Sequence, residues 1–248
     1  ALGAVDQAGL LAPLPAGVAA VVPADYRAKD GTWTGVTGRA RVVAYDPTQV
    51  SETQVPRSVF DLTDPKWRGQ VAIAPTNASF QAFVTAMRVA DGDDVTRKWL
   101  DGLVANDVQK YEQNGLILDA VDAGRVKLGL INHYYWYEKV AEVGEDAVRA
   151  RIAFTEPGDP GSLVNVAGVG LLAGAAGDVR AAEFAEWLLS EPAQRWFVAN
   201  TFEYPLLPSV AAPKGLPPLD SLRGPDVPLA DLAGLPATLA MLGDTGLL

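Results

Sequence analysis

The sequence predicts an α/β protein with a mainly parallel or mixed sheet, and three observations lead to this prediction. Short apolar runs, typical of buried strands, alternate with longer segments whose apolar residues recur every three or four positions, as in helices. Small polar or turn-forming residues separate most of these segments. Of the 248 residues, 49% are hydrophobic. This is enough for one large domain or two smaller lobes.

In the first half of the chain, helices are predicted at residues 1–10, 80–90 and 95–104, and strands at 41–45 and 71–74. The first helix closes near Gly9, because glycine is the usual residue after a helix end. Glycines at 31, 35 and 38 punctuate the next segment. Asp46-Pro47 ends the first strand, and Asp93 or Asp94 caps the last helix of this half.

In the second half, helices are predicted at residues 116–123 and 134–143, and strands at 127–131 and 163–172. The helix at 116–123 stops at Gly124. Two further helices, split at Pro192, lead to the extended turn "EYPLLPSV" and a helical tail over 230–248. Strands that alternate with helices in this way favour α/β packing.

Composition excludes several classes of function. The net charge of −10, without a run rich in Lys or Arg, argues against a nucleic-acid partner. The chain has no cysteine and one histidine, so thiolate and multi-histidine metal sites are excluded. The longest apolar stretch, residues 162–177, is broken by Asn165 and glycines, so the chain is not predicted to span a membrane. No G-x-S-x-G, P-loop or dinucleotide motif follows a strand, so no enzyme is predicted.

An aromatic cluster lies in "INHYYWYE", residues 131–138, where a strand ends and a helix begins. Tyr134, Tyr135 and Tyr137 follow the only histidine, His133. A phenol is normally neutral, but a hard, highly charged cation can displace its proton and bind the phenolate oxygen. Ferric iron suits this ligand, whereas zinc and copper favour histidine or cysteine. The residues leave two interpretations open, convergence of Tyr134 and Tyr135 on one ion or simple packing of all the rings.

Three polar junctions of the same form are candidates for holding an anion. Asn77-Ala78-Ser79 and Asn114 lie before predicted helices, and Asn132 follows a predicted strand. Backbone amides at helix N-termini and polar side chains there favour oxyanions. Turns and caps use the same residues, so this alternative stays open for each junction. Arg39 is a weaker candidate, because it can instead pair with a surface acid.

Several long runs resemble the ferric-iron-binding proteins of bacterial ABC importers. These are "DLTDPKWRGQVAIAPTNASFQAF", "YEQNGLILDAVDAGRVKLGLINHYYWYE", "DPGSLVNVAGVGLL" and "EYPLLP". The resemblance extends over the whole chain, and the tyrosine pair after a strand that ends in Asn is its most specific element. It implies a two-lobed periplasmic binding protein of type II, located in the periplasm or otherwise outside the cytoplasm.

The resemblance also implies a ligand set and partners. Tyr134 and Tyr135 would bind Fe³⁺ together with a synergistic anion, phosphate or carbonate. The anion would lie at Asn77, Ala78, Ser79, Asn114 and Asn132. The partner would be an ABC transporter permease, the full-length protein would be a monomer, and a lipid could anchor its N-terminus. The alternative on the same fold is a receptor for a polyamine, thiamine or an oxyanion.

The lobes implied by the resemblance are discontinuous in sequence. Residues 1–41 and 164–215 form the first lobe, and residues 42–163 and 216–248 form the second, with hinge strands at 41–46 and 163–172. Family members begin with further strand–helix units that supply first-lobe metal ligands. The first lobe is therefore expected to be incomplete, with an uncovered edge or completion by another segment. Tyr134 and Tyr135 are then expected to be accessible, without a complete iron shell in this chain.

Overall fold

The structure, a computed structural model, describes residues 2–222, 224–225, 227, 229, 232 and 234–248. The chain forms two compact units. Unit 1 comprises Ala1–Arg39, Val164–Ser221 and Val227–Ala233, and unit 2 comprises Ala40–Leu163, Leu222–Asp226 and Gly234–Leu248. Each unit is therefore built from segments that are distant in sequence. Within the part of the chain that is described, no helix has the length and apolar character needed to cross a membrane.

Unit 2 contains a mixed sheet. Its strands are the second half of β2 (Trp33–Tyr45), β3 (Val71–Ile73), β4 (Gln109–Lys110), β5 (Leu128–Asn132) and β6 (Arg151–Ala153). β5 lies between β2, to which it is antiparallel, and β3, to which it is parallel. β4 continues the sheet parallel to β3, and β6 pairs with the end of β2. Because β3, β4 and β5 run in the same direction, their carboxyl ends lie along one edge of the sheet.

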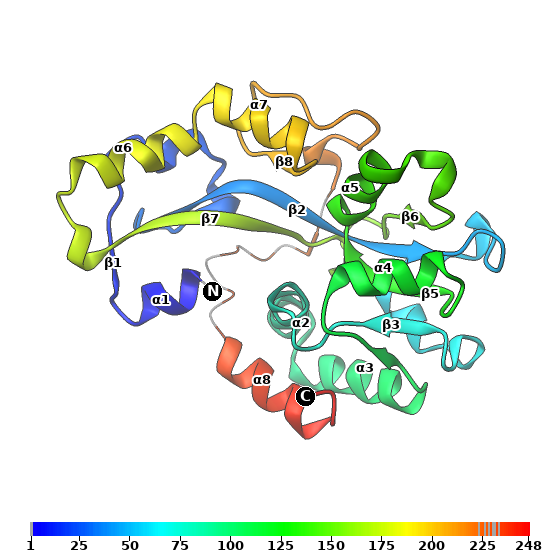
Figure 1. Cartoon of the computed structure of the whole chain (residues 1–248). Coiled ribbons are helices and arrows are strands. Elements are labelled where there is room, and N and C mark those ends of the chain that lie inside the picture. Colours follow the sequence, from blue (N-terminus) through cyan, green and yellow to red (C-terminus); the bar gives the residue numbers. More distant parts are fainter. Residues whose placement is uncertain (1, 223, 226, 228, 230–231, 233) are drawn as a thin grey trace. The chain divides into compact units, whose positions relative to one another are not determined.

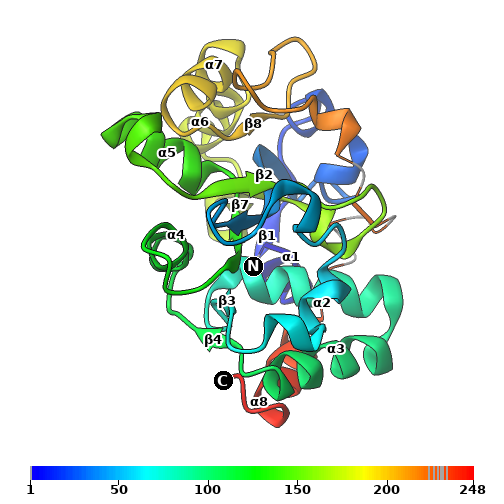
Figure 2. The same ribbon diagram turned by 90° about the vertical axis from the view of Figure 1, so that its right-hand side faces the viewer.

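The helices of unit 2 are α2 (Ala78–Asp91), α3 (Asp93–Ala105), α4 (Asn114–Asp122), α5 (Tyr134–Val143) and α8 (Leu235–Asp244). Figure 2 shows α4 on one side of β3 and α2 with α3 on the other. The residue before α3 is Gly92, so Asp93 and Asp94 lie in its first turn and neither is the predicted cap. Within the predicted helical tail, residues 230, 231 and 233 lie outside the described residues.

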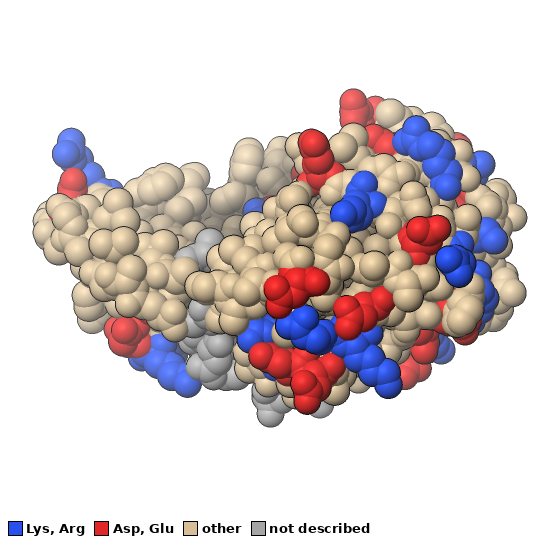
Figure 3. Space-filling model, turned by 90° about the horizontal axis from the view of Figure 1, so that it is seen from below, with Lys and Arg blue, Asp and Glu red and all other residues tan. Residues whose placement is uncertain are grey.

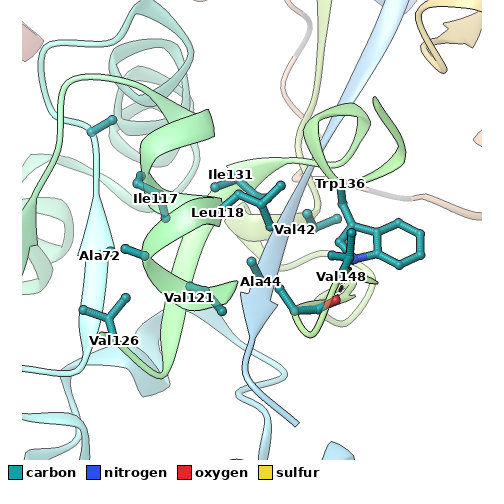
Figure 4. Packing of buried hydrophobic residues seen from close by; sticks show 13 residues of the cluster. Val42, Ala44, Ala72, Ile117, Leu118, Val121, Val126, Ile131, Trp136 and Val148 are labelled. Carbon is teal, nitrogen blue, oxygen red and sulfur yellow. Dashed lines mark hydrogen bonds between the residues drawn. The ribbon is translucent and has the colours of Figure 1, made fainter. Parts of the chain in front are cut away.

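The core of unit 2 fixes α4 and α5 on the sheet. Ile117 and Val121 of α4 are fully buried, as is Ile131 of β5, and Figure 4 shows these side chains in one cluster. Trp136 of α5 joins the cluster, and its Nε1 donates a hydrogen bond of 2.7 Å to the carbonyl of Ala150. Full burial of a Val, Leu or Ile side chain contributes about 1.5–3 kcal/mol. This packing positions the N-termini of both helices.

The surface of unit 2 carries charges of both signs close together. Arg88 of α2 pairs with Asp93 at 2.9 Å, and Arg97 of α3 pairs with Asp244 of α8 at 3.3 Å. On the face of unit 2 seen in Figure 3, basic and acidic side chains are interspersed. Both partners of the Arg97–Asp244 pair are exposed, and an exposed pair of this kind contributes only about 0–1 kcal/mol. This face therefore does not offer the extended basic tract that a polyanion would require.

Unit 1 contains the first part of β2, which Figure 1 shows together with the remaining elements of this unit. These are α1 (Leu2–Gln7), β1 (Leu11–Ala12), β7 (Val164–Leu172), α6 (Val179–Leu188), α7 (Glu191–Asn200) and β8 (Tyr204–Pro205). β1 pairs antiparallel with β7, and β8 pairs antiparallel with β2. The two helices predicted on either side of Pro192 are α6 and α7.

The strand predicted at 41–45 is longer, because β2 begins at Trp33. The glycines at 35 and 38 lie inside this strand and do not end it. A Cβ atom at Gly35 would lie 2.6 Å from Leu206 Cδ1 and 3.0 Å from the carbonyl oxygen of Tyr26. A Cβ atom at Gly38 would lie 3.2 Å from Tyr204 Cβ. These glycines therefore allow neighbouring chain segments to approach β2 closely.

Unit 1 exposes large apolar side chains on α6 and α7. Phe184, Trp187 and Trp196 are 57%, 55% and 56% exposed. The rings of Phe184 and Trp187 stack with their centroids 6.0 Å apart and their planes at 14°. Apolar surface of this size in contact with water is unfavourable.

The lobe boundaries and the incomplete first lobe inferred from the sequence stay predictions.

Candidate functional site

The three polar junctions identified from the sequence all belong to unit 2, at the carboxyl ends of β3, β4 and β5. The β3–α2 junction carries Ser79 and the β4–α4 junction carries Asn114. Asn114 Nδ2 lies 3.4 Å from Ser79 Oγ, so the structure brings these two junctions together. A Cβ atom built at Gly115 would lie 3.9 Å from the ring of Tyr135, which follows β5. The start of α4 therefore lies between Ser79 and the tyrosine pair.

Tyr134 and Tyr135 are the first two residues of α5. Their rings are stacked, with centroids 4.4 Å apart and planes at 27°. Both side chains are half-buried. Neighbours in a regular helix point about 100° apart, yet these two side chains converge so that their rings stack. The pair thus presents two adjacent phenols from one rigid helix terminus.

His133 is fully buried and anchors the start of α5 to β2. Its backbone N–H donates to the carbonyl of Ala40 at 2.9 Å, and its Nδ1 accepts the N–H of Ala40 at 3.1 Å. The carbonyl of His133 cannot serve as the acceptor for the N–H of Ala40, because it already accepts the N–H of Trp136 in α5. The imidazole accepts in its place and so extends the β2–β5 ladder by one residue. Nδ1 also lies 3.3 Å from the carbonyl oxygen of Ala40, and the shorter contact with the N–H of Ala40 corresponds to the neutral ring with its proton on Nε2. The ring meets Tyr134 edge-on, at 5.9 Å and 90°.

Tyr137, the third tyrosine of the cluster, lies in a different environment. Its ring packs edge-on against Trp136 at 4.9 Å and also contacts His133 at 6.4 Å. Burial, and then the nearby carboxylate of Glu145, raise the pKa of Tyr137. Its phenolate form is therefore disfavoured.

Sequence reasoning missed Arg41, which lies on β2 opposite Asn132. Its side chain is buried, and its guanidinium carbon lies 5.1 Å from the ring centre of Phe83 and 5.9 Å from that of Phe80. Burial lowers the pKa of Arg41 to about 10, while Tyr134 acts in the opposite direction. Arg41 thus stays charged at neutral pH beside the tyrosine pair. The sequence feature that could have identified Arg41 is its position directly before the apolar run "VVAY".

Arg39, the predicted arginine, belongs to unit 1 and is held by a carboxylate there. Its Nε and Nη2 donate to Glu203 at 3.1 and 3.2 Å. Thr37 also donates a hydrogen bond to Glu203. Pairing of Arg39 with a surface acid was the alternative inferred from the sequence, but Glu203 is only 7% exposed. The carboxylate of this pair is therefore buried, whereas the side chain of Arg39 is 35% exposed.

The remaining predicted anion-binding residues have local roles that the structure defines. Asn77 is the N-cap of α2, and its Oδ1 accepts the backbone N–H of Ser79 at 2.9 Å. Ala78 is exposed at the start of that helix. Asn132 is buried at the end of β5. Asn114 is 2% exposed, and its Oδ1 has no hydrogen-bond partner.

The chemistry of the site is that of oxygen ligands. Within the described residues, no group of three or more His, Cys, Asp or Glu side chains is placed to hold a metal ion. The donors gathered near α5 are instead two phenols, the guanidinium of Arg41 and the polar groups of Ser79 and Asn114. Phenolate oxygen suits a hard cation, and the guanidinium suits an anion.

Comparison with known proteins identifies a family and similar iron-binding relatives. Residues 1–226 match the family described as bacterial extracellular solute-binding protein. The Fe(3+)-binding periplasmic protein of Serratia marcescens is 35% identical over 229 residues, which cover 92% of this chain and 68% of the relative. The major ferric iron-binding protein of Neisseria meningitidis serogroup B is 35% identical over 232 residues, which cover 92% of this chain and 69% of the relative.

Solved structures share the fold. Iron-bound HitA from Pseudomonas aeruginosa matches with a TM-score of 0.92 at 34% identity, over 99% of this chain and 79% of that one. Apo FutA2 from Synechocystis PCC6803 matches with a TM-score of 0.83 at 30% identity, over 99% of this chain and 81% of that one. The predicted type II periplasmic binding protein fold and the resemblance to ferric-iron-binding proteins are thereby confirmed. The chain belongs to the family of bacterial extracellular solute-binding proteins, which are binding proteins and not enzymes.

Proposed function

We propose that this chain captures ferric iron outside the cytoplasm and delivers it to the permease of an ABC importer. The observation that carries the proposal is the stacked pair Tyr134 and Tyr135 at the start of α5, in a chain with no cysteine and one histidine. The names of the Serratia and Neisseria relatives support iron as the solute. A periplasmic location is supported by the name of the Serratia relative, which is a periplasmic protein.

In this proposal Tyr134 and Tyr135 bind Fe³⁺ as phenolates. Each phenol must lose a proton that it normally keeps up to a pH near 10. The ferric ion itself supplies the driving force, because a close trivalent charge strongly favours the anionic oxygen. The positive charge of Arg41 acts in the same direction on Tyr134. Iron release would correspondingly be favoured by reprotonation of the two phenols.

A synergistic anion completes the proposed site. Two phenolates leave Fe³⁺ with a net positive charge, and a phosphate or carbonate ion would neutralise it and fill open coordination positions. The groups that support an anion here are Arg41, Ser79, Asn114 and Asn132, of which Arg41 is charged and buried. Hydrogen bonds to ionised partners typically contribute about 1.5–3 kcal/mol each.

An oxyanion receptor without iron is the alternative that a specific observation favours. The buried guanidinium of Arg41 would serve a free oxyanion as well as an iron-bound one. The same charge disfavours a cationic polyamine or thiamine at this place. The oxyanion alternative gives no role to the stacked tyrosine pair, so the ferric-iron function is preferred.

The test is spectroscopic. Addition of a ferric salt with phosphate to the full chain is expected to produce a purple phenolate-to-iron charge-transfer band. Tyr134→Phe and Tyr135→Phe each remove one charged ligand, and each should weaken iron binding at least about tenfold, equivalent to about 1.4 kcal/mol. Tyr137→Phe is the matched control on the same helix and should keep both the band and the affinity. A double variant, Tyr134→Phe with Tyr135→Phe, that retained its iron and its band would refute the proposal.

A further inference from the structure

One lysine connects the helix that carries the tyrosine pair to the helix beside it. Lys139 of α5 donates from Nζ to Asp119 of α4 at 2.7 Å, and the same Nζ pairs with Asp122 Oδ2 at 3.0 Å. The side chains of Lys139 and Asp122 are only 22% and 18% exposed. Burial acts against the charge of Lys139, but its bonds with the two aspartates raise its pKa overall. The lysine is therefore charged at neutral pH and forms a partly buried connection between α4 and α5.

This connection fixes the position of α5 along α4. A Cβ atom at Gly115 would lie 3.9 Å from the ring of Tyr135, and four residues further along each helix Asp119 meets Lys139. Residues four apart in a helix lie on the same face, one turn from each other. The two contacts therefore show that α4 and α5 run side by side in the same direction. If α5 slid by one turn, the lysine would lose its partners and Tyr135 would leave the start of α4.

A second connection prevents rotation of α5 and passes through Ala150. Asp122 Oδ1 accepts the N–H of Ala150 at 2.9 Å, and the carbonyl of Ala150 accepts Nε1 of Trp136 at 2.7 Å. Trp136 and Lys139 both belong to α5. The helix is therefore attached to Ala150 directly through Trp136 and indirectly through Lys139 and Asp122. These bonds form a closed ring around Ala150, which is itself fully buried.

The orientation of α5 matters because both phenols lie in its first turn. A helix rises about 1.5 Å per residue, so Lys139 lies about 6 Å along α5 from Tyr135 and acts at a distance from the phenol oxygens. A rotation of α5 by about 10° would move an oxygen about 6 Å from the helix axis by about 1 Å. Metal–ligand distances tolerate changes of only about 0.2 Å. Small movements of this helix would therefore separate the two phenols from a shared ion.

We propose that Lys139 is a positioning residue for the tyrosine pair. Its bonds with Asp119 and Asp122 hold α5 in the register and rotation that present Tyr134 and Tyr135 to one ion. The inference rests on the proposed function, because it names a residue that determines iron affinity without contacting iron. Its structural half, the fixed position of Tyr135 beside α4, can be tested without iron.

The first test is a nuclear Overhauser measurement on the full, iron-free chain. The α-proton of Gly115 that stands where a Cβ atom would be is close enough to the ring of Tyr135 to give a cross-peak. Lys139→Met keeps the length of the side chain but removes its charge, so this cross-peak should be lost. Lys139→Arg can still donate to both carboxylates and should retain it. Lys66→Met, which removes a pair with Asp64 at a 58% exposed side chain, is the matched control and should retain it as well.

The second test is a ferric titration of the same variants in the presence of phosphate. Lys139→Met should weaken iron binding about tenfold or more, the loss typical for residues that orient metal ligands. Its charge-transfer band should also shift, because the geometry of the two phenolates changes, whereas a role in stability alone would leave the band in place. Lys139→Arg should recover most of the affinity, and Lys66→Met should change neither property.

A double-mutant cycle tests whether Lys139 acts through its carboxylate partner. Asp122→Ala should also weaken iron binding, and its combination with Lys139→Met should lose less than the product of the two single effects. Multiplication of the two effects would show that the residues act separately and would overturn the proposed ring. Circular dichroism verifies that each variant is folded. Asp119→Ala, at a 54% exposed side chain, is the milder replacement and should weaken the same cross-peak if Lys139→Met does not fold.

The outcomes separate this inference from the proposed function. An unchanged cross-peak in the Lys139→Met chain would overturn the inference, and so would its loss with unchanged iron affinity and band. Absence of a ferric band in the unmodified chain would refute the proposed function. The comparison of cross-peaks would still decide whether Lys139 fixes the position of Tyr135, because it contains no iron.

Discussion

At the scale of single residues, His133 performs a task that a backbone group usually performs. Its Nδ1 accepts the N–H of Ala40 at 3.1 Å at the position where β5 has already turned into α5. The strand and the helix therefore share one well-defined junction, and Tyr134 begins the helix directly after it. Ala40 is itself 1% exposed, so its N–H has no access to water if the imidazole is removed.

His133→Leu is expected to lower the free energy of unfolding by about 1–3 kcal/mol, because it leaves a buried N–H without an acceptor. His133→Asn should lose less, since Asn Oδ1 occupies nearly the position of Nδ1 and can accept the same bond. Urea unfolding of the three proteins measures the difference. A Leu variant as stable as the Asn variant would show that this hydrogen bond does not contribute.

At the scale of elements, the distance between α4 and the sheet depends on Gly129 of β5. A Cβ atom at Gly129 would lie 2.3 Å from Ile117 Cγ2 and 3.3 Å from Val121 Cγ2. Any larger residue would push α4 away from β5. Because Asn114 and Gly115 begin α4, this spacing also determines where they lie relative to Tyr135.

Gly129→Ala should destabilise the protein by about 1–3 kcal/mol, the usual cost of overpacking a core. Gly174→Ala, at a glycine with nothing within 4 Å of the added atom, is the control and should have little effect. Adding Ile117→Ala to the Gly129 variant should give less than the sum of the two single losses, because the clash is relieved. Thermal unfolding of the four variants gives these values, and simple additivity would argue against the close contact.

Most helices and strands were predictable because their signals are local. The helix predicted at 134–143 coincides with α5, since glycine follows an amphipathic segment there. The length of β2 was not predictable, because Gly35 resembles a turn until Leu206 is known to pack on it. Arg41 was missed for the same reason, as its burial depends on Phe80 and Phe83, which lie far along the chain. The tyrosine pair was found because adjacent residues form it, and its role in binding stays a prediction.

At the scale of the whole molecule, ligand binding and stability are linked. A ligand that binds only the folded state stabilises it in proportion to the logarithm of its concentration over Kd. The chain belongs to a family of solute-binding proteins, so its solute is expected to change its unfolding behaviour. The buried positive charge of Arg41 adds to this expectation, because an anion would neutralise it.

Ferric iron with phosphate, at a free concentration about a hundredfold above Kd, should therefore raise the free energy of unfolding by about 2.7 kcal/mol. Calorimetric scans with and without the two ligands measure the shift in Tm. Removal of iron by a strong chelator should reverse it. The chain with both Tyr134→Phe and Tyr135→Phe should show no iron-dependent shift, and an equal shift in that variant would place the iron elsewhere.

The chain's single histidine has a consequence for observing this molecule in solution. The carbon-bound protons of one imidazole give one set of resonances in a proton NMR spectrum, without isotope labelling or assignment. This ring stands edge-on to Tyr134, at 5.9 Å between centroids. Paramagnetic Fe³⁺ at the tyrosine pair would broaden these signals, whereas diamagnetic Ga³⁺ would only shift them. The protein thus carries its own reporter of metal occupancy at the residue next to the proposed ligands.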